Sequence, residues 1–237
     1  MEGVYRLVAG GLGFRVIREI RRPARGIIDR LRRLTLGNIC DAMNMLGAVG
    51  PAIRPIVAPQ GRLTGPAITV KTRSGDYLMV VEALKVARPG DVLVVSTGGR
   101  PESCVWGGLL SARARDCHIA GLVTDGYVRD LEEMRRVGLP VFAAGLQSSS
   151  PSKLGPGEVN TPVALGGAVV LPGDIVVADE EGVVVVPADH AEDVCSRAEE
   201  AKAADEAKFR EIAEHRWKEE YFADADAIFA SRGGILQ

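Results

Sequence analysis

Hydrophobic positions along the chain follow two different spacings, and each spacing predicts one kind of element. Apolar residues recur at the period of an α-helix in residues 27–46, 77–87, 106–117 and 131–137. Short unbroken apolar runs predict buried strands at residues 92–95, 119–123 and 141–144. Because these strands alternate with the last two helices, we expect a parallel β-α-β-α-β unit with right-handed crossovers and helices covering the sheet.

On either side of this unit, short apolar runs are separated by glycine and proline. They predict short strands and turns within residues 53–70, and a second sheet layer from residues 168–171, 175–178 and 183–186. The charged stretch 188–216 predicts a long helix. The expected fold class is therefore α/β: one layered β/β/α-type domain with a parallel core, a flanking second sheet and a C-terminal helix.

This pattern divides the chain into three parts. Residues 1–26 form an N-terminal extension, residues 27–187 the α/β domain, and residues 188–237 a helical arm that we expect to reach a neighbouring protomer. The arginine-rich stretch 15–33 carries isoleucines at roughly helical spacing, which favours a solvated helix face over an RNA-binding arm.

Charge and cysteine content narrow the class of protein. The net charge is -2 with both signs mixed, which argues against a nucleic-acid or membrane surface. The four cysteines show no CxxC spacing, and no apolar run has the length of a membrane span. We therefore expect reduced thiols in a cytoplasmic protein, and local positive groups wherever a small anion binds.

Two loops at the carboxyl edge of the predicted sheet carry the candidate chemistry. In the first loop, Gly107 and Gly108 begin a helix whose amides lack intrahelical partners. Together with Leu109 and Leu110, they can hold a carboxylate or an enolate oxygen. Close helix packing without a ligand is the alternative reading of the two glycines.

The second loop ends with Arg129 and Asp130, directly after a predicted strand. A surface ion pair, or an N-cap by Asp130, would be the ordinary reading of such a pair. Arginine also offers a planar fork for a carboxylate, and aspartate is a hard oxygen ligand for Mg²⁺ or Mn²⁺. Since the glycine loop lies at the same edge, we expect a site for a small 2-oxo acid there.

Other common catalytic patterns are missing from the sequence. The three histidines, His118, His190 and His215, have no zinc-ligand spacing. There is no Walker loop and no complete dinucleotide fingerprint, and the serines at 148–150 lack a nucleophile-elbow context. Zinc, nucleotide cofactors and a serine nucleophile are therefore not expected.

The segments carrying this candidate chemistry resemble the RraA-like family, which includes 4-hydroxy-4-methyl-2-oxoglutarate/4-carboxy-4-hydroxy-2-oxoadipate aldolases and regulators of ribonuclease E activity. The resemblance extends from about residue 34 to 187. It is carried by the motifs Trp106-Gly107-Gly108-Leu109-Leu110, Gly121-Leu122-Val123-Thr124-Asp125-Gly126-Tyr127-Val128-Arg129-Asp130, Gly155-Pro156-Gly157-Glu158-Val159-Asn160 and Gly182-Val183-Val184-Val185-Val186-Pro187.

The resemblance implies a trimer or a dimer of trimers and an Mg²⁺- or Mn²⁺-dependent lyase. Such a lyase releases pyruvate by retro-aldol cleavage, often with oxaloacetate decarboxylation as a side activity. By the same resemblance, the amides of residues 107–110 and Arg129 hold the pyruvyl group, and Asp130 binds the metal. An acid from the C-terminal helix of an adjacent subunit would match Glu200, or else Glu199.

One departure from the family pattern leaves other functions open. Family aldolases commonly carry an acidic residue where this chain has Gly108. No general base is evident in the sequence; Asp125, Glu102 or a water held by a carboxylate or metal are the candidates. The alternatives are a non-catalytic regulator that binds a ribonuclease or another protein, and a hydrolase or tautomerase using the same loops.

Overall fold

The computed structural model describes residues 13–99 and 102–235. Its helices are α1 (Arg25–Leu31), α2 (Leu36–Ala42), α3 (Leu78–Val86), α4 (Gly108–Asp116), α5 (Leu131–Val137), α6 (Ala191–Ala213) and α7 (Lys218–Ser231), with a 3-10 turn η1 (Ala188–His190). Its strands are β1 (Phe14–Val16), β2 (Arg54–Val57), β3 (Leu63–Thr72), β4 (Val92–Ser96), β5 (Cys104–Trp106), β6 (Gly121–Thr124), β7 (Tyr127–Val128), β8 (Val141–Ala143), β9 (Gly145–Leu146), β10 (Gly157–Val159), β11 (Val163–Leu165), β12 (Ala168–Val170), β13 (Ile175–Asp179) and β14 (Gly182–Val186).

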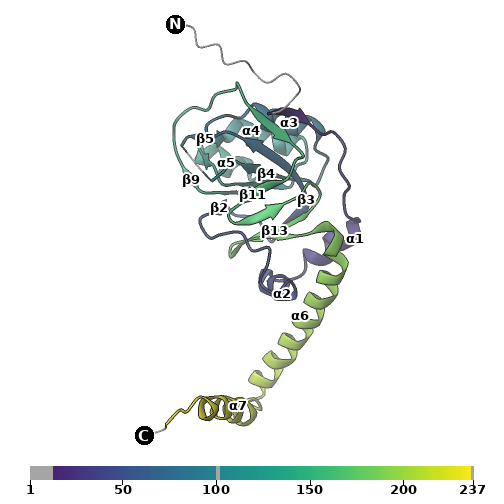
Figure 1. The fold of residues 1–237 in the computed structure, drawn as a ribbon, viewed down its shortest axis with the longest axis vertical. Helices are drawn as coiled ribbons and strands as arrows, with labels where there is room; N and C mark the ends of the chain where they lie inside the picture. Colours follow the sequence, from purple (N-terminus) through teal and green to yellow (C-terminus); the bar gives the residue numbers. More distant parts are fainter. Residues whose placement is uncertain (1–12, 100–101, 236–237) are drawn as a thin grey trace.

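The predicted β-α-β-α-β unit is confirmed. Strands β4, β6 and β8 are parallel neighbours, and α4 and α5 make the two crossovers. The helix expected at residues 77–87 is α3, which makes a further crossover from β3 to its parallel neighbour β4. All three helices lie on one face of the sheet (Figure 1). The carboxyl ends of β4 and β6 thus open at the same edge, where the two candidate loops lie.

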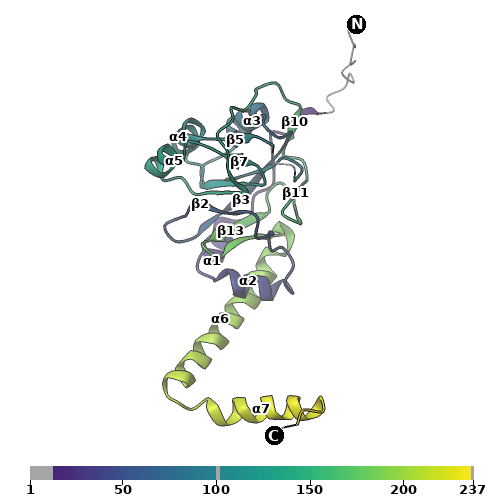
Figure 2. The ribbon, with the colours of Figure 1, turned by 90° about the vertical axis from the view of Figure 1, so that its left-hand side faces the viewer.

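Alternation of side chains along the central strands builds a separate core on each face of the sheet. On β4, Leu93 and Val95 face the helices, whereas Val92 and Val94 face the opposite layer. That layer is the hairpin β13–β14, whose outer face packs in turn on α1, α2 and α6. The order helices, sheet, hairpin and helices is visible in Figure 2. The layered α/β fold class is confirmed.

The second layer differs in detail from the prediction. Strand β13 pairs with the first half of β3, so the layer continues from the main sheet instead of forming a separate one. The second half of β3 pairs with β10. Short strands were expected within residues 53–70, but β3 runs for 10 residues because it borders two layers in succession. Strand β12, also assigned to the layer, pairs only with β11.

The prediction of a single helix over residues 27–46 is wrong, because the structure has two helices there. Helix α1 ends at Leu31, and α2 begins after Thr35, whose hydroxyl accepts a hydrogen bond from the amide of Asn38 at 3.1 Å. A side-chain cap of this kind starts a new helix, and the apolar spacing continues across the break because both helices pack on the β13–β14 hairpin.

The basic stretch 15–33 is helical only within α1. Residues 14–16 form β1, which pairs in parallel with β10, so this part of the N-terminal extension joins the main sheet. Residues 1–12 lie outside the described part of the chain.

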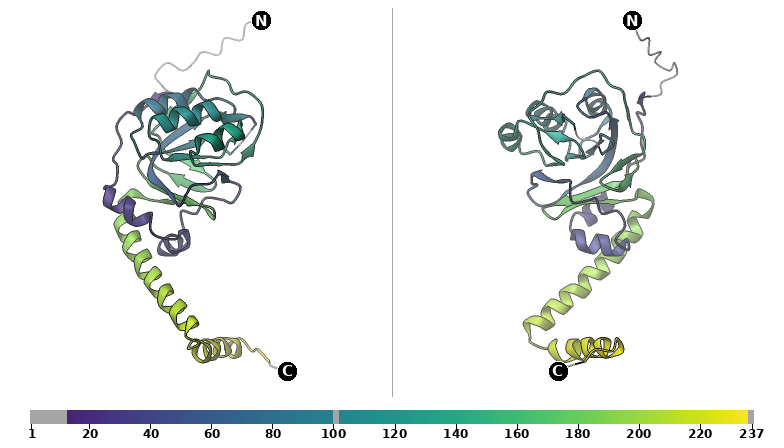
Figure 3. Two further views of the ribbon diagram at one scale, coloured as in Figure 1. Left: turned by 180° about the vertical axis from the view of Figure 1, so that it is seen from behind. Right: turned by 60° about the vertical axis from the view of Figure 1, so that its left-hand side comes forward.

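The long C-terminal helix is confirmed in outline, with different ends. Residues 188–190 form η1, α6 follows, and α7 was not predicted. The first half of α6 packs on α1 and α2, while its second half and α7 extend away from the domain (Figure 3). Large apolar side chains on this arm are exposed, among them Phe209, Tyr221, Phe222 and Ile228.

The four cysteines are all free, and Cys117 is exposed. Burial raises the pKa of the thiols of Cys40, Cys104 and Cys195. Among the described residues, no helix is long and apolar enough to cross a bilayer.

Candidate active site

Three short parallel strands hold the loops above the carboxyl edge of the main sheet. Strand β7 pairs with β5 on one side and β9 on the other. In this register Trp106 lies opposite Val128, and the amide of Arg129 donates to the carbonyl of Trp106 at 3.1 Å. The residues that follow, Gly107 and Asp130, are therefore neighbours although they are far apart in sequence. The expected convergence of the two loops is present.

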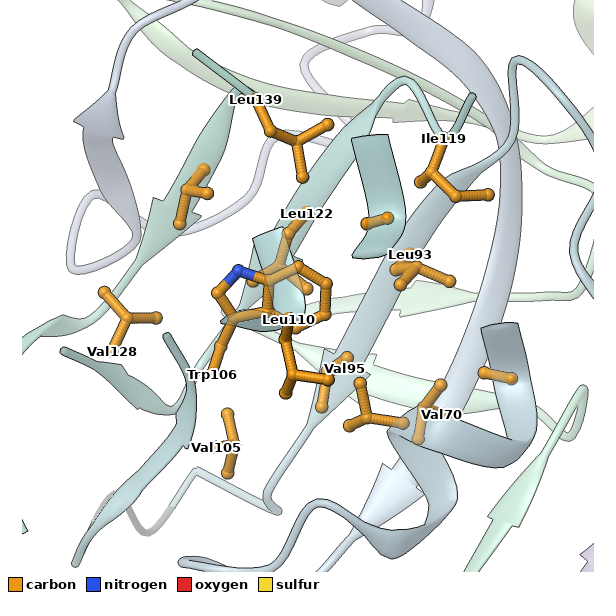
Figure 4. Close-up of a cluster of buried hydrophobic side chains, with 14 of the residues drawn as sticks. Val70, Leu93, Val95, Val105, Trp106, Leu110, Ile119, Leu122, Val128 and Leu139 are labelled. Atoms are coloured by element: carbon orange, nitrogen blue, oxygen red, sulfur yellow. The ribbon is translucent and has the colours of Figure 1, made fainter. Parts of the chain in front are cut away.

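Trp106 anchors the first loop in the core. Its ring lies among side chains of the sheet and of α4, at the centre of the cluster in Figure 4, and its indole N–H donates to the Ser111 hydroxyl at 2.7 Å. The indole N–H is thus satisfied inside an apolar cluster. The helix begins at Gly108, two residues later than the sequence pattern indicates, because Val105 and Trp106 belong to β5.

Asp130 occupies the N-cap position of α5 but does not cap that helix. Its backbone is left-handed, with φ 60° and ψ 51°, a conformation that aspartate tolerates better than most residues. Its carboxylate instead accepts a hydrogen bond from the amide of Gly108, with Oδ2 at 3.2 Å, at the start of α4. The side chain therefore joins the two loops.

Arg129 lies beside this carboxylate, but its guanidinium also has another partner. Its Nε is 3.6 Å from Oδ2 of Asp130, and its Nη1 donates to the hydroxyl of Ser150 at 2.7 Å. The two side chains are 34% and 41% exposed, so the pair is not a dry internal salt bridge. Both groups remain accessible to a ligand.

A side chain at either glycine would collide with a residue of the second loop or of α5. A Cβ at Gly107 would lie 2.6 Å from Oδ2 of Asp130, and a Cβ at Gly108 would lie 2.6 Å from the Cβ of Glu133 on α5. The amides of Leu109 and Leu110 have no intrahelical partners because they lie in the first turn of α4. The N-cap residue of this helix, Gly107, offers them no side-chain acceptor. These amides, Arg129 and Asp130 meet at one helix start.

A pocket of about 170 Å³ opens at this point. Its size suits a small molecule, since pockets for drug-sized ligands are roughly 300–1,000 Å³. The lining residues are Tyr77, Trp106, Gly107, Leu109, Leu110, Arg113, Arg129, Asp130, Ser150 and Pro151. Gly108 contributes to the helix start and is absent from the lining.

Four of these lining residues were not predicted as site residues. Tyr77 and the segment carrying Ser150 and Pro151 come from parts of the chain without a motif, and Arg113 lies on the exposed side of α4, where the sequence pattern also places it. A buried carboxylate, that of Asp76, brings two of these segments together: it accepts hydrogen bonds from the amide of Leu78 and from the Ser152 hydroxyl, at 2.9 and 2.6 Å. Such a link between distant segments has no local sequence signal.

The acidic residues suggested as bases lie elsewhere. Asp125 is buried, its carboxylate accepts hydrogen bonds from the amides of Thr97 and Gly99 at 2.5 and 2.8 Å, and it lines a different pocket. Glu102 is exposed, and its amide is bonded to Ser74. On α6, Glu199 is paired with Arg30 of the same chain, whereas Glu200 is exposed; neither lines the pocket of its own chain.

Comparisons with known proteins bear directly on this site. The sequence profile of the RraA-like family, described as Aldolase/RraA, matches residues 36–185 and so spans both loops of the site. The chain belongs to the RraA-like family. One relative, from Halalkalibacterium halodurans, is named "Putative 4-hydroxy-4-methyl-2-oxoglutarate aldolase"; it is 34% identical over 79% of this chain and 89% of its own length.

Two further proteins similar to this chain bear different names. A 4-hydroxy-4-methyl-2-oxoglutarate aldolase from Thermus thermophilus is 33% identical over 60% of this chain and 85% of its own length. The structure of RraAS2 from Streptomyces coelicolor, described as an unusual member of the RNase ES inhibitor RraA protein family, superposes with a TM-score of 0.70 at 28% identity, covering 84% of this chain and 100% of that one.

The RraA-like site contains an oxygen donor suited to a hard divalent cation. Within residues 13–99 and 102–235, no group of three or more acidic, histidine or cysteine side chains could enclose a metal ion. Mg²⁺ commonly retains several water molecules and binds through only one or two protein carboxylates. The accessible carboxylate of Asp130 fits such a cation, whereas a dehydrated cage or a thiolate site does not fit.

The structure shows what a side chain would meet at Gly108, where the sequence departs from the pattern expected for an aldolase. A side chain at residue 108 would begin in the space that the Cβ of Glu133 occupies. We expect Gly108→Asp to lower the free energy of unfolding by about 1–3 kcal/mol, the usual cost of overpacking. Glu133→Gly should remove the collision. Because glycine is a poor helix former, this change should itself lower the free energy of unfolding by about 1 kcal/mol.

Chemical denaturation of the two single variants and the double variant measures this coupling. The double variant should be more stable than the sum of the single effects predicts. Glu132→Gly, at the neighbouring exposed position of α5, is the matched control and should combine additively with Gly108→Asp. If the effects of Gly108→Asp and Glu133→Gly on stability simply add, the helix start relaxes around a new side chain at residue 108.

Proposed function

We propose that this chain is a divalent-metal-dependent lyase that cleaves a C–C bond of a 4-hydroxy-2-oxo acid and releases pyruvate. Decarboxylation of oxaloacetate is proposed as a second activity of the same site. The observation that carries the proposal is the meeting of Arg129, Asp130 and the free amides of α4 at one small pocket. Aldolase-named relatives in the same family support it.

Each of these groups has a role in the reaction. Arg129 binds the carboxylate of the 2-oxo acid, for which its planar fork is suited. The amides of Leu109 and Leu110 donate to the carbonyl oxygen as it gains negative charge during cleavage. Mg²⁺ or Mn²⁺ held by Asp130 would supply Lewis-acid stabilisation of that same charge.

Cleavage also requires a proton to leave the 4-hydroxyl group. The C3–C4 bond breaks, its electron pair passes to the pyruvyl fragment, and C3 is protonated afterwards. Asp130 is the acidic residue among the pocket lining, so we assign to it the orientation of a water molecule that accepts the hydroxyl proton.

Pyruvate release tests the proposal directly. The full chain is incubated with oxaloacetate and with 4-hydroxy-4-methyl-2-oxoglutarate, with added Mg²⁺ or Mn²⁺ and with EDTA. Metal-dependent release of pyruvate from either substrate supports a lyase. Turnover that is equally fast in EDTA, or no turnover of any 4-hydroxy-2-oxo acid, would contradict it.

Exchange of Arg129 for lysine should separate charge from geometry. Lysine keeps the positive charge but loses the two-pronged hydrogen bond, so we expect KM for oxaloacetate to rise about tenfold with little change in the melting temperature. Steady-state kinetics with a thermal melt of each variant measures both. Arg136→Lys on the exposed face of α5 is the control. An unchanged KM in Arg129→Lys would remove Arg129 from the substrate site.

We also propose that the chain works as a homo-oligomer, a trimer or a dimer of trimers. The exposed apolar residues of the arm and its extension away from the domain support this assembly. In it, α6 of one protomer would bring Glu200 towards the pocket of another. Light scattering of the full chain and of Phe222→Glu tests whether the arm holds copies together.

A protein-binding regulator is the second candidate function, and the likeness to RraAS2 over that protein's whole length is the observation that favours it. A regulator would inhibit a ribonuclease equally well in Arg129→Lys and in EDTA. Inhibition without any lyase activity would select this function over the first.

A further inference from the structure

We propose that Arg113 is the specificity-determining residue that binds a second, distal carboxylate of the substrate, so that the site selects dicarboxylic 2-oxo acids over monocarboxylic ones. This inference rests on the proposed function, because it concerns the ligand of the same pocket. Three observations carry it: the placement of Arg113, its unpaired charge, and the contrast with Arg115 on the same helix.

Arg113 lines the same pocket as Arg129 and Asp130. It lies on α4 one turn after Leu109, whose amide is at the open helix start. Side chains of a helix lean towards its N-terminus, which directs Arg113 back over the pocket. A ligand bound at the helix start by its first carboxylate therefore extends towards a second guanidinium.

The guanidinium of Arg113 is available to a ligand. Over residues 13–99 and 102–235 it makes no hydrogen bond and no salt bridge, unlike Arg129, which donates to Ser150 and lies beside Asp130. Arg113 is exposed, and its place in the pocket lining leaves its guanidinium free to meet a ligand. The free charge inside the lining points to a ligand that carries negative charge at that end.

Charge balance agrees with a dianionic ligand. The pocket lining contains two guanidinium groups, Arg113 and Arg129, and one carboxylate, Asp130. Because the proposed function assigns Asp130 to a divalent cation, a single ligand carboxylate bound to Arg129 leaves the charge of Arg113 without a counterpart. A second carboxylate on the ligand provides it, through a charge-assisted hydrogen bond of the stronger kind.

Arg115 supplies a matched control. It lies two residues further along α4, turns to a different pocket, and donates to the carbonyl of Gly138 at 3.4 Å. Removal of its charge changes the net charge of the protein as much as removal of Arg113 does. A difference between the two variants therefore reports on position and not on overall charge.

Calorimetric titration of the full chain in Mg²⁺ with pyruvate and with 2-oxoglutarate tests the proposal without requiring turnover. In Arg113→Gln the Kd for 2-oxoglutarate should rise at least about tenfold, as expected for one lost charge-assisted hydrogen bond, while the Kd for pyruvate changes less than about twofold. Arg113→Lys should recover part of the loss. Arg115→Gln should bind both acids as the wild type does.

Other outcomes overturn the proposal. Equal weakening of both acids in Arg113→Gln would make Arg113 a structural residue, and unchanged binding of 2-oxoglutarate would remove it from the site. Failure of the wild type to bind either acid would also end it. Binding is measured apart from pyruvate release. If Arg113→Gln weakens the binding of 2-oxoglutarate alone and no lyase activity is found, the assignment of Arg113 stands and only the proposed reaction fails.

Discussion

Asp130→Asn is expected to lower the rate of pyruvate release by on the order of a thousandfold, because it removes the negative charge that would hold the divalent cation. Metal catalysis of this type lowers the activation barrier by several kcal/mol, and each 1.4 kcal/mol changes the rate about tenfold. Asparagine has nearly the same shape, tolerates the left-handed backbone, and keeps an oxygen that accepts from the amide of Gly108. The fold should therefore survive.

This substitution separates three roles of the same carboxylate. If Asp130 only joins the helix start to the second loop, asparagine preserves the link and the enzyme stays active. If it binds the cation, activity falls and the Kd for Mn²⁺, followed by electron paramagnetic resonance, rises with it; if it only orients a water molecule, activity falls and that Kd is unchanged. Asp116→Asn, at the exposed end of α4, controls for the loss of one surface charge. An Asp130→Asn variant with full activity would contradict the metal-site assignment.

The parallel core could be read from the sequence because its strands are buried on both faces. Strands such as β4 are then unbroken apolar runs, bounded by helices with a clear period. The placement of both loops at one edge follows from parallel topology alone, which is why Arg129 and Asp130 could be expected near Gly107. Hydrophobic burial thus predicted the place of the candidate site.

Features that depend on single contacts were not predictable in this way. The strands β5, β7 and β9 have three, two and two residues, too few to show any period, yet their pairing sets the register of the two loops. The apolar spacing that suggested one helix over residues 27–46 is interrupted by a single capping hydroxyl, that of Thr35. Arg113 shows the same limit, since spacing alone cannot distinguish a solvated face from a pocket wall.

The buried carboxylate of Asp76 is the strongest case of a contact without a sequence signal. One of its oxygens accepts from the amide of Leu78 at 2.9 Å; the other accepts from the Ser152 hydroxyl and the amides of Leu154 and Gly155, at 2.6, 2.7 and 3.0 Å. It thereby fixes the start of α3 against the segment that carries Ser150 and Pro151. Two walls of the pocket depend on this one side chain.

Burial alone would raise the pKa of Asp76, but the hydrogen bonds from Ser152, Leu154, Leu78 and Gly155 outweigh it and hold that pKa below its ordinary value. A group with a lowered folded-state pKa stabilises the native state fully above its unfolded pKa, which is about 3.9 for aspartate. That contribution is lost as the pH falls through the folded-state value. Stability should therefore decline below about pH 4 in part because Asp76 becomes protonated.

Asp76→Asn is expected to lower the free energy of unfolding by about 3 kcal/mol at pH 7, because the new amide group must face donors on either side and leaves at least one of them unsatisfied. Urea denaturation between pH 7 and pH 3 measures the difference from the wild type. The difference should narrow towards the acid end, since the wild-type carboxyl then becomes neutral too. Asp116→Asn, on the exposed end of α4, should show no such trend. A difference that stays constant with pH would mean that the shape of the side chain, and not its charge, holds the two segments together.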